Sequence, residues 1–384
     1  MKKILALVLV LVMAATALVA CGEKPTGDET ATLKIGGIGP TTGGAAIYGT
    51  AVMNAAQLAV NEINANGGIN GMQVEFLWQD DEHNAEKAVN AYNTLMDKGM
   101  QVIVVTVTSA PCIAVVAEAE EDNIFMLTPS GSAVAAIDAP NAFRVCFSDP
   151  NQGIGAADYI KNNNVGSKVA VIYNVSDPYS NGIYEKFAAQ ANAIGLEIVV
   201  AEAFTNDSAT DFSVQIQKVK DSGADLLFLP IYYEAAALIL DQANSANLDV
   251  KYFGCDGLDG VIGQLGDKAD LAEGVMLLTP FAADATDDKT VAFTAAYKAA
   301  YNGEIPNQFA ADAYDAVYIV KAAIEAAGIK DASISASDLC DAIVAQMTKL
   351  EYDGVTGLMT WSADGEPSKE PKAMVIKNGA YAAM

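Results

Sequence analysis

Two short segments carry residue types that could hold a small charged molecule. In TSAPC, residues 108–112, Ser109 stands at a position suited to a helix N-cap and Pro111 falls in the first turn. The unpaired N–H groups of a helix start attract anions. In FGCDGLDG, residues 253–260, Asp256 follows a predicted strand, at the end where open α/β sheets bind ligands. The residues alone also permit a plain helix cap at Ser109 and an Asp-Gly turn at Asp256.

Residue patterns typical of catalysis are missing from the sequence. His83 is its sole histidine and lies in DDEHNAE, where a solvated side chain is expected. Neither a Gly-x-Ser-x-Gly elbow nor a His-Glu-x-x-His helix occurs. The loop GGIGPTTGG after the first predicted strand is one residue longer than the usual dinucleotide fingerprint. We therefore expect neither enzymatic activity nor a cofactor.

Metal-binding and disulfide patterns are equally weak. Asp80, Asp81 and Glu82 are adjacent but lack the spacing of a calcium loop, so no metal site is predicted. The later cysteines are far apart and form no Cys-x-x-Cys pair, which favours buried free thiols and leaves any disulfide unassigned. These residues are Cys112, Cys146, Cys255 and Cys340.

The first 32 residues have the organisation of an export signal followed by a tether. Lys2 and Lys3 precede an uncharged run, residues 4–20, which is at the lower limit for spanning a bilayer and ends in small residues. We interpret residues 1–20 as a cleaved signal peptide rather than a retained anchor. The segment LVAC resembles the lipobox of bacterial lipoproteins, which predicts lipid attachment at Cys21, although a secreted protein with an incidental cysteine is the alternative. Residues 21–32 would then tether an extracytoplasmic protein to the bacterial cell membrane.

Composition indicates an acidic, two-unit protein. The net charge is -26, and removal of Lys2 and Lys3 leaves 20 basic against 48 acidic side chains, a net of -28. Such a charge repels nucleic acid and anionic lipid headgroups, so neither is an expected partner. The length of 384 residues with 52% hydrophobic composition predicts two packed units.

The hydrophobic pattern predicts two α/β halves in series. Short apolar strands such as LKIGGIG and QVIVVTV alternate with helical segments, and the alternation restarts after NAFRVCFSDPNQG with KVAVIYN and DLLFLP. This order predicts two doubly wound parallel sheets with right-handed crossovers. Three further helices, near 287–301, 307–327 and 337–348, suggest that the chain returns to cover the first unit.

Longer segments of the chain resemble one family of proteins. These are KIGGIGPTTGGAAIYGTAVMNAAQLAVNEINANGGINGMQVEFLWQDDEHNAEKAV, VTSAPCIAVVAEAEEDNIFMLTPSGSA, FRVCFSDPNQG, YNVSDPYSNGIYEKF and TWSADGEP. Together they resemble the periplasmic leucine/isoleucine/valine-binding proteins that feed ABC importers. The resemblance implies the type I periplasmic binding fold, with two lobes joined by three crossovers, here near 146–150, 278–281 and 355–360. It also implies lobe 1 at 33–148 plus 281–356 and lobe 2 at 149–280 plus 357–384.

The same resemblance implies roles for particular residues. Ser109 and Ser132 would bind a ligand carboxylate, and the Ser130 carbonyl and Asp256 would take its ammonium group. Aromatic side chains would wall the site, namely Tyr48, Phe309, Tyr179 and Tyr232, whereas Tyr233 would face away. Some relatives carry a disulfide beside the first-lobe site, but the matching positions are His83 and Thr108, so this bridge is not expected.

The expected function is therefore binding of a small amino acid with an uncharged side chain between the lobes, and its delivery to an ABC permease by a monomeric, lipid-anchored protein. Burying both ligand charges requires partners for each, which favours a zwitterion held by both lobes. Binding would then shift a hinge equilibrium toward a closed form. Two alternatives remain open at this point: a binding protein for an amide, urea-like or other small solute, and a sensory ligand-binding protein for a membrane receptor.

Overall fold

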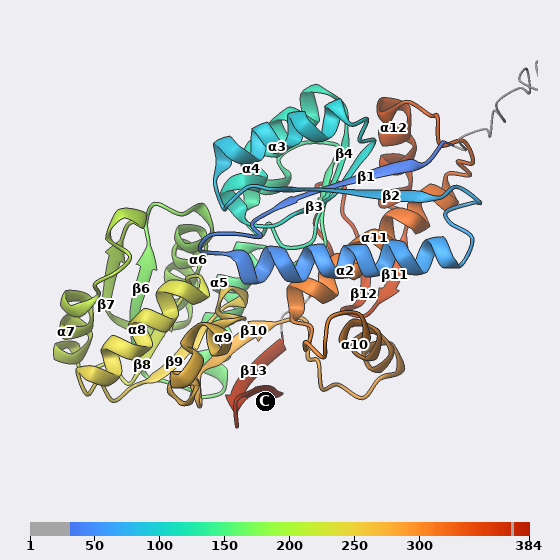
Figure 1. Ribbon diagram of the computed structural model, residues 1–384. Helices are drawn as coiled ribbons and strands as arrows, with labels where there is room; N and C mark the ends of the chain where they lie inside the picture. Colours follow the sequence, from blue (N-terminus) through green and yellow to red (C-terminus); the bar gives the residue numbers. More distant parts are fainter. Residues whose placement is uncertain (1–30, 370–371) are drawn as a thin grey trace, which may run out of the picture.

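The computed structural model describes residues 31–369 and 372–384. The predicted fold class, with two doubly wound parallel sheets, is confirmed (Figure 1). The first sheet is parallel in the order β2-β1-β3-β4-β5. Its strands are β1 (Leu33–Gly39), β2 (Val74–Asp80), β3 (Val102–Thr106), β4 (Phe125–Thr128) and β5 (Ala142–Arg144).

Helices cover both faces of the first sheet. One face packs against α2 (Ala46–Ala65), α11 (Gln308–Ala326) and α12 (Ala336–Met347), and the other against α3 (Ala85–Asp97), α4 (Ser109–Glu121) and the short η1 (Val134–Ile137). All four residues of β4 are buried, as expected for a strand covered on both sides. Side-chain caps begin three of these helices, with Asn84 accepting from the Lys87 N–H, Asn307 from the Ala310 N–H and Ser335 from the Asp338 N–H. The late helix α11 therefore completes the first unit, as the sequence predicted.

The second sheet has the order β14-β13-β10-β9-β8-β6-β7. Its parallel strands are β6 (Lys168–Asn174), β7 (Glu197–Phe204), β8 (Leu226–Leu229), β9 (Lys251–Gly254) and β10 (Met276–Thr279), and β13 (Lys372–Lys377) and β14 (Ala380–Ala383) add antiparallel. On one face lie α5 (Asp149–Asn162) and α6 (Pro178–Ile194), and on the other α7 (Ser213–Ser222) and α8 (Tyr233–Ser245). The short elements are η2 (Asn206–Ser208), η3 (Asp256–Leu258), α9 (Val261–Leu265) and η4 (Gly266–Ala272).

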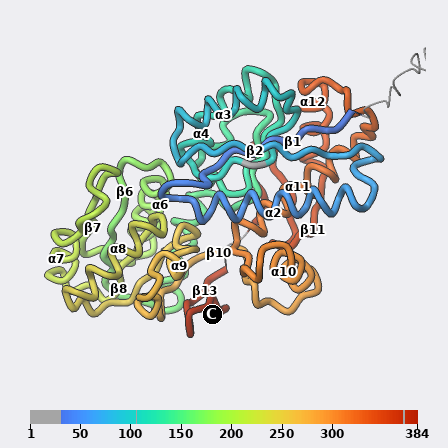
Figure 2. The backbone as a smooth tube through the Cα atoms, in the orientation of Figure 1, coloured from blue at the N-terminus to red at the C-terminus, as the bar shows by residue number. Residues whose placement is uncertain are grey.

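The chain passes between the two units more than once, as the tube in Figure 2 shows. It leaves the first sheet after Arg144 and begins α5 at Asp149, and it leaves the second sheet after Thr279 before α10 (Asp288–Ala300). The third predicted position, 355–360, overlaps a hairpin of β11 (Glu351–Gly354) and β12 (Gly357–Thr360). Next to this hairpin Trp361 is buried in the core around the first sheet, and the next strand of the second sheet is β13.

One hydrophobic core cluster extends through both units. It includes Val52 of α2, Phe309 of α11 and Ala236 of α8, together with Phe281 from the connection after β10. The units are therefore packed against each other rather than joined as independent beads. Within the described ranges, no helix combines the length and apolar character needed to cross a membrane.

Candidate functional site

The loops after the strands of both sheets meet in one place. In the first sheet the strand order reverses between β1 and β3, and in the second between β6 and β8. Ligands of doubly wound sheets bind beside such reversals, at the carboxyl ends of the strands. All eight predicted ligand-binding residues follow carboxyl strand ends or begin a helix of this region: Tyr48, Ser109, Ser130, Ser132, Tyr179, Tyr232, Asp256 and Phe309.

The three serines lie on the first unit and are buried. Ser109 is the first residue of α4, and the N-cap is Thr108, so the predicted cap position was one residue late. The Ser109 Oγ accepts from the Ala133 N–H at 3.2 Å, which leaves its own O–H free to donate. Ser130 Oγ donates to the Val107 carbonyl at 2.8 Å. Ser132 Oγ is buried without a hydrogen-bond partner among the described residues.

A buried carboxylate that the sequence analysis missed lies beside Ser132. Asp149, the first residue of α5, is 1% exposed, and neither of its carboxylate oxygens has a hydrogen-bond partner in the described part of the chain. Its backbone N–H donates to the Ser132 carbonyl at 2.9 Å, which fixes the two residues together. A buried carboxylate without a partner is costly, so this position calls for a donor or a cation. Burial raises the pKa of Asp149 well above its usual value; the adjacent Ser132 side chain opposes this shift, and the charge of neighbouring Asp256 adds to it.

Asp256 supplies a second buried carboxylate on the second unit. Its Oδ1 accepts from the Tyr179 hydroxyl at 2.7 Å, and the Gly257 N–H donates to the same hydroxyl at 2.9 Å. Gln152 Oε1 accepts from the Asp256 N–H at 3.1 Å. Burial raises the pKa of Asp256 to about 7, although the bond from Tyr179 opposes this shift. The carboxylate is therefore held in place by a tyrosine, and no cationic side chain in the described part of the chain pairs with it.

Aromatic rings from both units form one wall of this region. Tyr48 lies 4.3 Å from Phe309 and 5.8 Å from Tyr232 between ring centroids, and Tyr232 stacks on Tyr179 at 4.6 Å. The Tyr48 hydroxyl donates to the Gly257 carbonyl at 2.5 Å and so bridges the two units. Tyr233 also contacts Tyr48, with 4.8 Å between ring centroids, and its hydroxyl accepts from the Ile47 N–H at 3.3 Å, so that it faces away from the ligand stays a prediction.

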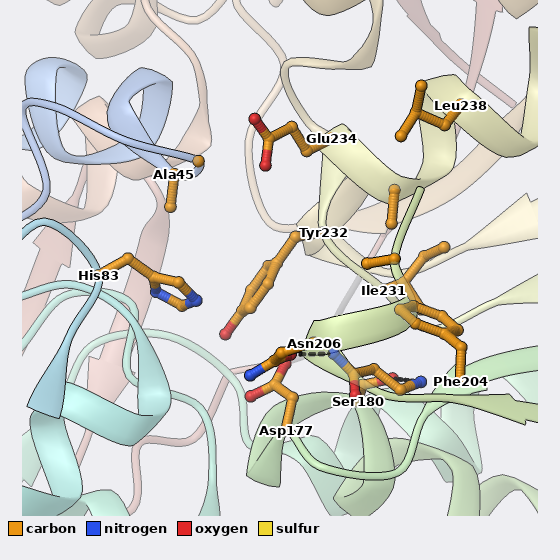
Figure 3. A pocket seen from close by; sticks show the side chains of 14 residues that line it. Ala45, His83, Asp177, Ser180, Phe204, Asn206, Ile231, Tyr232, Glu234 and Leu238 are labelled. Atoms are coloured by element: carbon orange, nitrogen blue, oxygen red, sulfur yellow. Dashed lines mark hydrogen bonds between the residues drawn. The ribbon is translucent and has the colours of Figure 1, made fainter. Parts of the chain in front are cut away.

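A cavity of about 290 Å³ opens at the edge of this region, between the two units (Figure 3). Ala45 and His83 line it from the first unit, and Tyr232, Asp177 and Asn206 are among its residues from the second. Figure 3 shows the His83 ring facing the Tyr232 ring across the gap, and their centroids are 5.5 Å apart.

The position of His83 bears on two predictions, its solvent exposure and the absence of a disulfide at positions 83 and 108. His83 is half-buried rather than solvated, and burial lowers its pKa. Its Nδ1 lies 2.8 Å from the Thr108 Oγ1, so a hydrogen bond joins the two positions where the disulfide was not expected. The prediction that the His83 side chain is solvated was wrong. Asp81, directly after β2, is buried, and its carboxylate accepts from the His83 N–H, so this loop turns inward.

The remaining sequence interpretations concern thiols, metals and the lipid anchor. The described cysteines are buried and free, and they are Cys112, Cys146, Cys255 and Cys340. Within the described ranges no group of three or more His, Cys, Asp or Glu side chains could hold a metal ion. The predicted lipidation site, Cys21, lies outside the described residues.

Comparisons with known proteins agree with this architecture. Residues 32–380 match the family model described as periplasmic binding protein. The Leu/Ile/Val-binding protein BraC3 of Rhizobium johnstonii is 34% identical over 340 residues, which cover 86% of this chain and 89% of that protein. The leucine-, isoleucine-, valine-, threonine-, and alanine-binding protein of Pseudomonas aeruginosa is 30% identical over 78% of this chain and 80% of its own length.

Solved structures give the same result. The branched-chain amino acid transporter substrate binding protein LivJ from Streptococcus pneumoniae, in complex with isoleucine, matches with a TM-score of 0.82 and 30% identity over 92% of this chain and 98% of that chain. The leucine binding protein LivK from Thermotoga maritima matches with a TM-score of 0.82 and 26% identity over the same shares. All four are named as binding proteins for amino acids. The chain belongs to the periplasmic binding protein family and groups with its Leu/Ile/Val-binding members.

Proposed function

We propose that this protein is the extracytoplasmic solute-binding component of an ABC importer and that it binds a branched-chain or other uncharged amino acid between its two units. The observation that carries the proposal is a pair of buried groups without partners. The Ser132 hydroxyl and the Asp149 carboxylate are adjacent and unsatisfied among the described residues. A ligand with one anionic and one cationic end would satisfy both.

In this arrangement the first unit binds the ligand carboxylate. The Ser109 and Ser132 hydroxyls donate to it, and the first-turn N–H groups of α4 add a favourable dipole. The ammonium group lies between Asp256, Asp149 and the Ser130 carbonyl. The aromatic wall of Tyr48, Phe309, Tyr179 and Tyr232 surrounds an apolar side chain. The relatives that bind leucine, isoleucine and valine support this choice of ligand.

We further propose the domain limits and the route of delivery. Lobe 1 comprises 33–148 plus 281–356, and lobe 2 comprises 149–280 plus the C-terminal segment. The β11–β12 hairpin favours placing residues 357–360 with lobe 1 instead of lobe 2, because Asp315 of α11 accepts from the N–H groups of Val355 and Thr356. The protein acts as a monomer, is anchored through a lipid on Cys21, and delivers its ligand to a permease in the membrane.

Calorimetric titration of the mature protein with single amino acids tests the proposed ligand. Leucine, isoleucine or valine should bind, while urea and small amides should bind more weakly because they lack the ammonium group. Saturation at 100 times Kd should add about 2.7 kcal/mol to the free energy of unfolding. Absence of heat and of thermal stabilisation with every amino acid would refute the proposal. For the anchor, Cys21→Ala should release the protein from the membrane fraction, and retention there would refute lipidation.

A further inference from the structure

A single buried arginine organises the loop that carries the predicted serines. Arg144, at the end of β5, is fully buried. One guanidinium nitrogen, Nη1, donates to the carbonyls of Gly131 at 3.1 Å and Ser132 at 2.5 Å, and Nη2 donates to that of Val134 at 3.4 Å. Its own backbone is fixed as well, since the Trp361 Nε1–H donates to the Arg144 carbonyl at 2.8 Å.

Each of these carbonyls belongs to a peptide group whose N–H points the other way. The described peptide bonds are trans, and in a trans peptide the C=O and N–H groups are antiparallel. The Gly131 carbonyl therefore faces Arg144 while the Ser132 N–H faces away from it. The Ser132 carbonyl also faces Arg144, and the Ala133 N–H of that peptide donates to the Ser109 Oγ at 3.2 Å.

This arrangement forms two hydrogen-bonded routes from one cation. A carbonyl that accepts a charge-assisted hydrogen bond polarises its peptide and makes the N–H a better donor. One route ends at the Ser132 N–H. The other passes through the Ala133 N–H to the Ser109 hydroxyl, whose proton remains free to donate. Both routes end at groups that the proposed function assigns to the ligand carboxylate or places next to it.

We propose that Arg144 is the remote counter-charge of the bound carboxylate, acting through the peptide groups 131–132 and 132–133 without touching the ligand. The inference rests on the proposed function and names Arg144 as its positioning residue. Glu366 pairs with the same guanidinium at 3.2 Å and is partly exposed, so it offers a matched control. Replacing Glu366 breaks that ion pair but leaves the cation and its contacts with the carbonyls.

The test compares leucine with leucinamide, which keeps the ammonium group and side chain but lacks the anionic carboxylate. Leucine affinity is measured by direct titration, and leucinamide affinity by its displacement of bound leucine. Circular dichroism confirms that each variant is folded. Arg144→Gln should weaken leucine binding about tenfold or more, because hydrogen bonds to charged groups are the stronger class, and should change leucinamide binding less than about threefold. Arg144→Lys, which keeps the charge but reaches fewer carbonyls, should give a smaller loss, again confined to leucine. Glu366→Gln should leave the ratio of the two affinities unchanged.

Equal loss of both probes in Arg144→Gln or Arg144→Lys would assign Arg144 a purely structural role and overturn the inference. A loss in Glu366→Gln that is confined to leucine and as large as the loss in Arg144→Gln would overturn it as well. If Arg144→Gln does not fold, the ratio measured with Arg144→Lys decides, since selective loss supports the inference and equal loss overturns it. A wild-type protein that binds no amino acid would refute the proposed function as well. If the protein binds leucine but the ratio of leucine to leucinamide affinity is the same in the Arg144 variants as in the wild type, the inference is refuted and the proposed function stands.

Discussion

Replacing Asp256 by asparagine isolates the charge of the residue predicted to hold the ligand ammonium. The substitution preserves shape, and the asparagine oxygen can still accept from the Tyr179 hydroxyl, which lies 2.7 Å from the Asp256 Oδ1. Asp256 is 3% exposed, so its interaction with an ammonium group is shielded little by water. Truncating one partner of a buried, hydrogen-bonded charge pair costs about 2–5 kcal/mol.

The lower end of that range applies because Asp149 remains as a second buried carboxylate. A loss of about 2 kcal/mol corresponds to about 30-fold weaker binding, measurable by calorimetric titration with leucine. The matched control is Asp249→Asn, an exposed aspartate at the opposite end of β9, which should leave the affinity unchanged. Asp256→Asn binding within about threefold of wild type, or an equal loss in Asp249→Asn, would refute the assignment of the ammonium to Asp256.

Three further predictions follow from the same geometry. Burial raises the pKa of Asp256 to about 7, so its carboxyl is protonated at lower pH and must lose that proton before it pairs with an ammonium group. Leucine affinity should therefore fall about tenfold per pH unit below 7 and level off above it. A leucine affinity that stays constant between pH 5.5 and 8 would contradict this prediction. Tyr48→Phe removes the hydroxyl that donates to the Gly257 carbonyl across the two units. The ligand-bound form should lose about 1 kcal/mol of stabilisation, so leucine should bind about fivefold more weakly. An unchanged leucine affinity would show that this hydrogen bond does not favour closure. A thiol reagent applied to the mature, lipid-free Cys21→Ala protein should label no cysteine until the chain is unfolded, because the four remaining thiols are buried. These are Cys112, Cys146, Cys255 and Cys340. Rapid labelling of the native protein would contradict their burial.

The fold was predictable because its determinants are local. Strands such as β4 and β8 are short apolar runs, and the helices that follow carry side-chain caps or regular apolar spacing. The three late helices were placed to within a residue or two of α10, α11 and α12. The third connection was harder, because residues 351–360 form a hairpin whose turn is held by Asp315 of α11, and a contact of that sequence separation leaves no local pattern.

The site was predictable only in part, for a physical reason. Tyr179 and Asp256 were identified by resemblance, and the structure joins their side chains by a hydrogen bond. Asp149 was missed because an aspartate before proline in FSDPNQG looks like an ordinary helix start. Its burial depends on the close approach of Gly182 in α6. A Cβ atom added to Gly182 would lie 3.2 Å from the Asp149 Oδ2. The signal available in the sequence was the position of this aspartate beside the first predicted crossover.

The most direct test of the central claim is a crystal structure of the mature protein with leucine. Opposite ends of the ligand should contact opposite units, with the carboxylate at the Ser109 and Ser132 hydroxyls and the ammonium between Asp149 and Asp256. A leucine bound in the reverse orientation, or held by one unit alone while Asp149 and Asp256 stay without a cation, would contradict the account.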